Sequence, residues 1–231
     1  MKYSVLLFPL LVLSLLVSGC GEQRVAPADQ PEYSAGERME SGHIADEAAG
    51  VQPVLTGTTM PDAMVRTAEG DSVTLMELVS DRPAVLVFYR GGWCPYCNKH
   101  MAELQQVEDK LVDMGYQILA ISPDRPKYLQ ATGSEQELSY TLLSDSPLHA
   151  TSAFGLAYKV DQETIDRYRE GGLDLAERAG YNHYALPVPA LFLVDTEGTI
   201  LFQYVNPDYT TRINADVLMA AARAYLPGNE E

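Results

Sequence analysis

Residues 84–97 read AVLVFYRGGWCPYC, and the fold follows from this stretch. The run from Ala84 to Tyr89 is continuously apolar and rich in residues that favour strands, which is typical of a strand buried on both faces of a central sheet. It leads directly into Cys94 and Cys97, which we place at the start of the following helix. The sequence therefore predicts a cysteine pair held where a buried strand ends and a helix begins.

This placement indicates redox chemistry at Cys94 and Cys97. The first N–H groups of a helix lack intrahelical acceptors and carry the positive end of the helix dipole, so they stabilise a thiolate at the first cysteine. We therefore expect Cys94 to be the nucleophile. Cys97, one turn further and facing inward, can attack a mixed disulfide or a sulfenic acid formed on Cys94 and close an intramolecular disulfide.

The flanking residues are candidates for supporting roles. They are Arg90, Trp93, Pro95 and Tyr96. Arg90, Lys99 and His100 add positive charge near the pair in sequence, and we expect His100 to be an exposed helix residue rather than a base. We interpret Trp93 as a packing lid beside the sulfur.

The cysteine count limits the alternatives to this interpretation. Cys20, Cys94 and Cys97 are the three cysteines of the chain. A loop as short as that between Cys94 and Cys97 restricts little of the unfolded chain, which argues against a purely structural disulfide. Zinc needs four ligands, and the histidines, at 43, 100, 149 and 183, show no paired spacing, which argues against a metal site. No cofactor is implied.

The remaining pattern predicts a mixed α/β domain. After the cysteines, an amphipathic helix ends at Gly115 and a second buried strand spans 116–122, which implies a parallel right-handed crossover. Further elements are expected as hairpins at 64–67/72–74 and 190–195/199–204, a short helix from Leu75, helices at 126–138, 147–155, 162–178 and 214–225, and a strand at 141–143. The result is a central sheet flanked by helices, with an N-terminal hairpin extension.

The N-terminus predicts export. Lys2 and the apolar run from Val5 to Val17 have the order of a secretory signal and are too short for a spanning helix. Residues 16–20, LVSGC, resemble the lipobox of bacterial lipoproteins, which implies lipidation of Cys20 and a location in the bacterial cell envelope, with the domain in the periplasm or otherwise outside the cytoplasm. An ordinary secretory signal that contains a cysteine is the alternative.

Composition separates the rest of the chain into a tether and a domain. We predict a signal peptide at 1–19, a lipidated cysteine followed by a disordered tether at 20–52, and one domain at 53–231. The formal net charge of −16 argues against nucleic acid as a partner and indicates a soluble acidic surface. The membrane is then contacted only through the lipid anchor.

A proline far along the chain points to the same site. In LPVPALF, residues 186–192, Pro189 directly precedes an apolar hairpin strand. Proline is excluded from central strands, so Pro189 is expected at the strand start in a special geometry. A trans bond remains the default for Val188–Pro189 on physical grounds alone.

Three segments together resemble the AhpC/TSA peroxiredoxin-like branch of the thioredoxin superfamily. They are the hairpin before Leu75, residues 88–97, and residues 188–200, within a match of about residues 53–227. The resemblance implies a thioredoxin-like fold, with Cys94 as nucleophile and Cys97 as resolving cysteine. It also implies a cis Val188–Pro189 bond against the sulfurs and an external, thioredoxin-like dithiol as reductant.

Two departures from that family leave the activity open. Peroxiredoxins place Thr or Ser three residues before the nucleophile and an Arg near the late strand, where this chain has Gly91 and Pro189. Both substitutions resemble thioredoxin or the TlpA-type periplasmic reductases instead. We expect a thiol peroxidase that reduces hydroperoxides; the alternative is a thiol–disulfide oxidoreductase acting on exported proteins. A non-enzymatic binding module is disfavoured, because the dithiol is so well placed.

Overall fold

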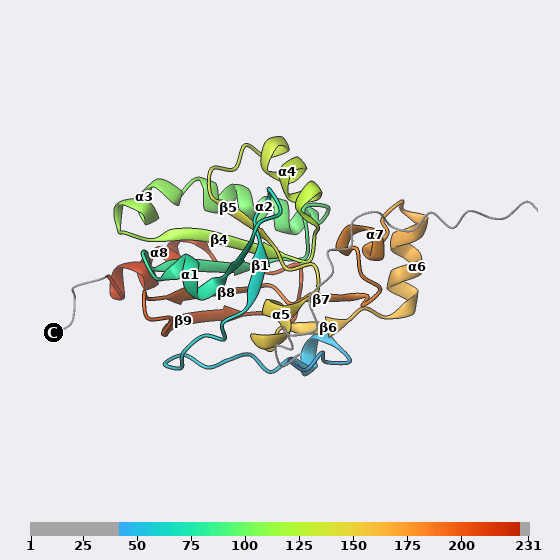
Figure 1. The fold of residues 1–231 in the computed structure, drawn as a ribbon, viewed down its shortest axis with the longest axis horizontal. Helices are drawn as coiled ribbons and strands as arrows, with labels where there is room; N and C mark the ends of the chain where they lie inside the picture. Colours follow the sequence, from blue (N-terminus) through green and yellow to red (C-terminus); the bar gives the residue numbers. More distant parts are fainter. Residues whose placement is uncertain (1–41, 227–231) are drawn as a thin grey trace, which may run out of the picture. The chain divides into compact units, whose positions relative to one another are not determined.

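The apolar run before the cysteines forms β3, Ala84–Phe88, inside a seven-stranded mixed sheet (Figure 1). This computed structural model describes residues 42–226. The strand order is β2-β1-β5-β4-β3-β8-β9, in which β3 runs parallel to β4, and β4 to β5, while β8 is antiparallel to β3. The other strands are β1 Met64–Arg66, β2 Ser72–Thr74, β4 Gln117–Ser122, β5 Thr141–Ser144, β8 Ala190–Val194 and β9 Ile200–Val205. The predicted mixed sheet, parallel crossover and N-terminal hairpin are confirmed.

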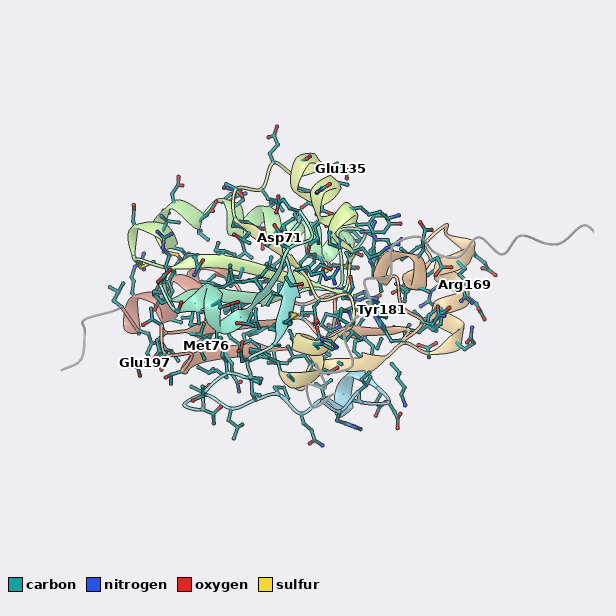
Figure 2. All side chains as sticks on the ribbon, in the orientation of Figure 1. Asp71, Met76, Glu135, Arg169, Tyr181 and Glu197 are labelled. Atoms are coloured by element: carbon teal, nitrogen blue, oxygen red, sulfur yellow. The ribbon has the colours of Figure 1, made fainter. Side chains whose placement is uncertain are left out.

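Helices cover both faces of this sheet, and two more pack in a separate small core. They are α1 Leu75–Val79, α2 Pro95–Gln105, α3 Glu108–Asp113, α4 Pro126–Glu135, α5 His149–Ala153, α6 Gln162–Glu170, α7 Leu175–Ala179 and α8 Ala215–Ala224, with a 3-10 turn at Ala48–Gly50. One core contains side chains of α2, α3, α4 and α8, and the other contains side chains of α1 and α5. Side chains such as Glu135, Arg169 and Glu197 extend from the outside of the ribbon (Figure 2).

Alternation along β3 explains why its run is continuously apolar. Val85 and Val87 belong to the first core, whereas Leu86 and Phe88 belong to the second, and all are at most 1% exposed. The Phe88 ring packs against Phe154 and Phe192, with centroids 4.9 and 5.9 Å away. A central strand has no solvent face, so every position on it is apolar.

Two predicted helices are interrupted. The helix after the cysteines divides near Gln106 into α2 and α3, and the helix predicted at 162–178 divides into α6 and α7. In the second case Gly172 has a φ of +81°, which ends the helical path, and the Asp174 carboxylate accepts the N–H groups of Ala176 and Glu177 to start a new helix. Helical periodicity alone does not reveal such breaks.

The segment between α5 and β8 forms a small subdomain with a two-stranded sheet, which was not predicted from the sequence. β6, Ala157–Lys159, pairs antiparallel with β7, Ala185–Pro187, and the two strands enclose α6 and α7. We call residues 157–187 the insertion. Val160, Ile165, Leu175 and Leu186 form its own small core.

The N-terminal boundary predicted at residue 53 is too late. Ala45 is 2% exposed, its N–H donates to the carbonyl of Ala157, and its carbonyl accepts from Lys159 N–H, each at 2.9 Å. This backbone pairing has no signature in the polar composition that suggested a tether. The predicted signal and the lipidated Cys20 lie outside the described residues and stay predictions. Among residues 42–226, no helix is long and apolar enough to cross a membrane.

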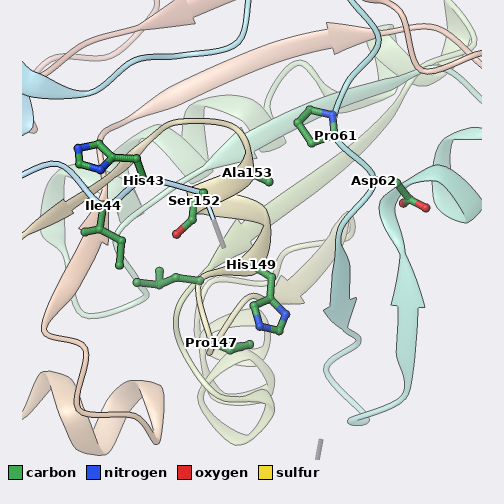
Figure 3. A pocket seen from close by; sticks show the side chains of 10 residues that line it. His43, Ile44, Pro61, Asp62, Pro147, His149, Ser152 and Ala153 are labelled. Atoms are coloured by element: carbon green, nitrogen blue, oxygen red, sulfur yellow. The ribbon is translucent and has the colours of Figure 1, made fainter. Parts of the chain in front are cut away.

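The same N-terminal segment borders a surface hollow of about 1080 Å³ (Figure 3). Its lining includes His43, Asp62 and His149. No group of three or more His, Cys, Asp or Glu within the described part of the chain is arranged to hold a metal ion.

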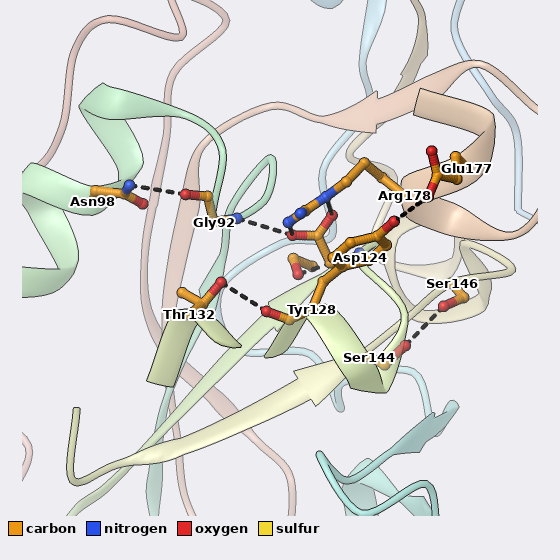
Figure 4. A network of polar contacts seen from close by, with 10 residues as sticks. Gly92, Asn98, Asp124, Tyr128, Thr132, Ser144, Ser146, Glu177 and Arg178 are labelled. Carbon is orange, nitrogen blue, oxygen red and sulfur yellow. Dashed lines mark hydrogen bonds and ion pairs between the residues drawn. The ribbon is translucent and has the colours of Figure 1, made fainter. Parts of the chain in front are cut away.

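A buried ion pair joins the insertion to the loop that carries the cysteines (Figure 4). Asp124 follows β4, and its carboxylate accepts from Arg178 of α7, with Nε 2.9 Å from Oδ1. It also accepts the Gly92 N–H at 2.9 Å. Burial raises the pKa of Asp124, and Arg178 opposes that rise. One carboxylate therefore fixes both the cysteine turn and the insertion.

We predict that Asp124→Ala lowers the free energy of unfolding by about 3 kcal/mol, because it leaves the Arg178 guanidinium and the Gly92 N–H without their acceptor. Asp46→Ala is the control, since the Asp46–Lys159 pair is also close, at 2.7 Å, but lies in solvent. Urea unfolding of both variants measures the difference. Equal effects of the two substitutions would contradict the assignment.

Candidate active site

Cys94 and Cys97 occupy the start of α2, as predicted. Cys94 is the N-cap residue and Pro95 follows at the first helical position, where a missing N–H costs nothing. Cys94 and Cys97 are 1% and 0% exposed, and both are free thiols. The site is thus a reduced dithiol at the buried end of a helix.

The two sulfurs differ in acidity. The pKa of Cys94 is lowered to about 6, chiefly by the hydrogen bond from the Cys97 thiol, with further help from the charges of Arg90 and Arg212, while burial opposes it. The pKa of Cys97 is raised well above its usual value by burial and by the neighbouring Cys94. Proton sharing thus favours a thiolate on Cys94 and a thiol on Cys97.

Arg212 reaches the pair from the segment between β9 and α8. Its Nη2 lies 3.1 Å from the Cys97 sulfur, while its Nη1 donates to the carbonyls of Tyr209 and Thr211 at 2.7 and 2.8 Å. The sequence prediction missed this residue. No local motif could reveal it, because the contact joins residues 115 positions apart.

Arg90 is a buried cation within an aromatic cage. It is 3% exposed, and its guanidinium carbon lies 4.2 Å from the centroid of the Tyr209 ring, 5.0 Å from that of Trp93 and 5.8 Å from that of Tyr168. Its Nη2 donates a hydrogen bond to the Tyr168 hydroxyl. Within residues 42–226 Arg90 has no carboxylate partner, and its buried Nε has no acceptor.

These residues border a cavity of about 310 Å³. Its lining comprises Arg90, Trp93, Cys94, Pro95, Tyr96, Arg167, Tyr168, Gly171, Leu173 and Tyr209. The predicted supporting residues Arg90, Trp93, Pro95 and Tyr96 are therefore gathered beside Cys94, and the insertion supplies much of the opposite wall.

Other expectations were wrong. His100 is buried, at 5% exposed, and burial together with the charge of Arg212 lowers its pKa to about 4, so it adds no positive charge at neutral pH. Lys99 points to solvent and pairs with Glu103 at 3.9 Å.

Pro189 is placed as predicted, but its peptide bond is not cis. It is buried one residue before β8, beyond the Phe88–Ala190 register pair, and does not line the cavity. All described peptide bonds are trans, Val188–Pro189 included. A proline is tolerated at this position because its nitrogen needs no hydrogen there, and the bond has the trans form that physical grounds make the default.

Steric crowding explains why the two residues before Trp93 and Cys94 are glycines. Gly91 has a φ of +139°, and a Cβ there would lie 2.4 Å from Trp93 Nε1 and 2.9 Å from Asp124 Oδ2. A Cβ on Gly92 would lie 1.9 Å from Thr132 Oγ1. A hydroxyl residue at position 91, as in peroxiredoxins, does not fit this turn.

Comparison with known proteins agrees with this architecture. Peroxiredoxin Bcp of Escherichia coli K12 is 27% identical over 106 residues, which cover 46% of this chain and 67% of that protein. A putative peroxiredoxin of Mycobacterium tuberculosis is 25% identical over 175 residues, covering 75% and 99% of the two chains.

Solved structures establish the fold. Peroxidoxin BcpB from Mycobacterium tuberculosis superposes with a TM-score of 0.57 at 22% identity, over 74% of this chain and 97% of that one. Reduced Prx3 from Vibrio vulnificus, solved in complex with hydrogen peroxide, gives 0.60 at 19% identity, over 73% and 99%. The predicted thioredoxin-like fold is thereby confirmed. The AhpC/TSA family model matches residues 56–203, and the chain belongs to the AhpC/TSA family.

Proposed function

We propose that this chain is a thiol peroxidase that reduces hydroperoxides through Cys94 and Cys97. The observation that carries the proposal is Cys94, a residue that lines a cavity, has a thiol pKa near 6 and accepts a hydrogen bond from a second thiol. The relatives named peroxiredoxin support the same reaction class. No cofactor is needed, since the electrons come from thiols.

The first half-reaction consumes the peroxide. The Cys94 thiolate attacks one peroxide oxygen, the O–O bond breaks, and the leaving oxygen departs with the electron pair and takes up a proton as water or an alcohol. Cys94 becomes a sulfenic acid. A sulfur with a pKa near 6 is a thiolate at neutral pH, so the nucleophile needs no separate base.

The second half-reaction closes the disulfide. Cys97 loses its proton and attacks the Cys94 sulfur, which expels water, and an external thioredoxin-like dithiol later reduces the disulfide. Because Cys97 is buried and its pKa is raised, its thiolate needs a positive partner. Arg212, 3.1 Å from its sulfur, is placed to serve that role.

Gly91 favours a second candidate, a thiol–disulfide oxidoreductase acting on exported proteins. The turn at Gly91 leaves no room for the hydroxyl side chain that peroxiredoxins direct at peroxide. The same cysteines then exchange disulfides with a protein substrate.

Peroxide oxidation and insulin reduction separate the two candidates. We expect hydrogen peroxide to oxidise the reduced protein at least about 10²-fold faster than it oxidises free cysteine, and insulin reduction with dithiothreitol to be weak. Cys94→Ser abolishes the peroxide reaction, whereas Cys97→Ser permits one oxidation and then stalls. Stopped-flow fluorescence of Trp93, the one tryptophan of the chain, follows the reaction. Peroxide reactivity equal to that of free cysteine, with efficient insulin reduction, would reverse the choice.

The lowered pKa of Cys94 predicts how its rate of alkylation depends on pH. The rate of its reaction with iodoacetamide should rise with pH through a midpoint near 6 and level off above about pH 7, because the thiolate is then fully formed. In Cys97→Ala the midpoint should move upward, since the hydrogen bond from the Cys97 thiol is lost and alanine has no donor to replace it. Mass spectrometry identifies the labelled cysteine, and faster labelling of Cys97 in the native dithiol would contradict the assignment.

Arg212→Gln should slow disulfide closure by about 10-fold while changing the first oxidation less, because loss of the cation raises the pKa of Cys97 further. Quenched samples trapped with dimedone measure the lifetime of the Cys94 sulfenic acid. Arg223→Gln, an exposed arginine of α8, is the control. An unchanged sulfenic acid lifetime in Arg212→Gln would remove Arg212 from the resolving step.

A further inference from the structure

Arg90 is a buried cation that has no carboxylate partner among the described residues. A buried guanidinium ordinarily pairs with a carboxylate, because an unpaired buried charge is costly. Among the described residues Arg90 has only the Tyr168 hydroxyl as a hydrogen-bond acceptor, and its Nε has none. Arg90 and Cys94 both line the same cavity. A buried, under-satisfied donor beside a nucleophile is typical of a binding position for a developing negative charge.

Tyr168 supplies a second donor to the same cavity. Its oxygen accepts from Arg90, which leaves its own O–H hydrogen available, and within residues 42–226 the Tyr168 hydroxyl donates no hydrogen bond to another residue. The ring is held in place by an edge contact with Trp93, with centroids 5.4 Å apart. Tyr168 belongs to α6 of the insertion, so the fold brings it to Cys94 from 74 positions along the chain.

We propose that Tyr168 and Arg90, which line the cavity beside Cys94, together polarise the peroxide, since Gly91 and Pro189 have no side-chain donor to do so. This inference rests on the proposed peroxidase function. As Cys94 attacks one oxygen, the Tyr168 hydroxyl donates its proton to the other, the O–O bond breaks, and the departing group leaves as water or an alcohol. Arg90 then stabilises the phenolate through its existing hydrogen bond until water returns the proton.

The insertion contains a matched control for this pair. Arg169 Nη2 donates to the Tyr184 hydroxyl at 2.8 Å, with the guanidinium carbon 5.3 Å from the centroid of that ring. The chemistry is the same, but Tyr184 does not line the cavity beside Cys94. Tyr184→Phe therefore removes an equivalent hydroxyl without touching the site.

The test compares two electrophiles in the full protein. In Tyr168→Phe, which keeps the ring and its packing on Trp93, we expect the rate constant for oxidation by hydrogen peroxide to fall by about 10²-fold. The rate of iodoacetamide alkylation at pH 7.5 should stay within about twofold, since that reaction has no leaving oxygen to protonate. Tyr184→Phe should match the unmodified protein in both reactions.

Three results would overturn the assignment, and each has a different meaning. Unchanged peroxide oxidation in Tyr168→Phe shows that its hydroxyl contributes nothing. Equal losses in oxidation and alkylation show that Tyr168 acts only on the Cys94 thiolate. If the unmodified protein itself reacts with peroxide no faster than free cysteine, the proposed peroxidase function fails first and this assignment fails with it.

Discussion

The hydrogen bond from the Gly92 N–H to the buried Asp124 carboxylate is the constraint on which the site depends. It fixes the turn between β3 and α2, and thereby the position of Cys94 at the helix start. The same carboxylate binds Arg178, so it joins the insertion to the turn, in addition to the hydrogen bond from Arg90 to Tyr168. Removal of that carboxylate would loosen both walls of the cavity, because they share one acceptor.

Two arginines place positive charge next to the two cysteines, one beside each. Arg90 lies on the side of Cys94, and Arg212 contacts the Cys97 sulfur. The hydrogen bond between the sulfurs places the negative charge on Cys94 first. In the proposed reaction Cys97 is the nucleophile once Cys94 has been oxidised, and the Arg212 cation lies beside its sulfur. This separation of charges supports two consecutive steps at sulfurs that are both almost fully buried.

Sequence alone predicts those parts of the molecule that depend on local pattern. The strands β3, β4, β8 and β9 are apolar runs long enough to identify, and the cysteine pair follows directly from the first of them. The helix predicted at 162–178 was too long, because periodicity does not register the local break at Gly172 and the new helix start at Asp174. The predictions of a tether at 42–52 and of an exposed His100 were wrong, because both depend on tertiary contacts. Tyr168 and Arg212 were missed for the same reason: each approaches the cysteines from a distant element, with no motif of its own.

The net charge of the chain affects which substrates can approach the site, according to their own charge. A net charge of −16 repels anions at long range, whereas the cavity beside Cys94 is lined by the cations Arg90 and Arg167. Hydrogen peroxide and simple organic hydroperoxides are uncharged at neutral pH, so the acidic surface does not hinder their approach. Negative charge develops only when the O–O bond breaks, inside the cavity and next to the buried cation. The acidic exterior and the cationic site are therefore compatible with the proposed peroxidase reaction, because a hydroperoxide is neutral on entry and anionic only at the transition state.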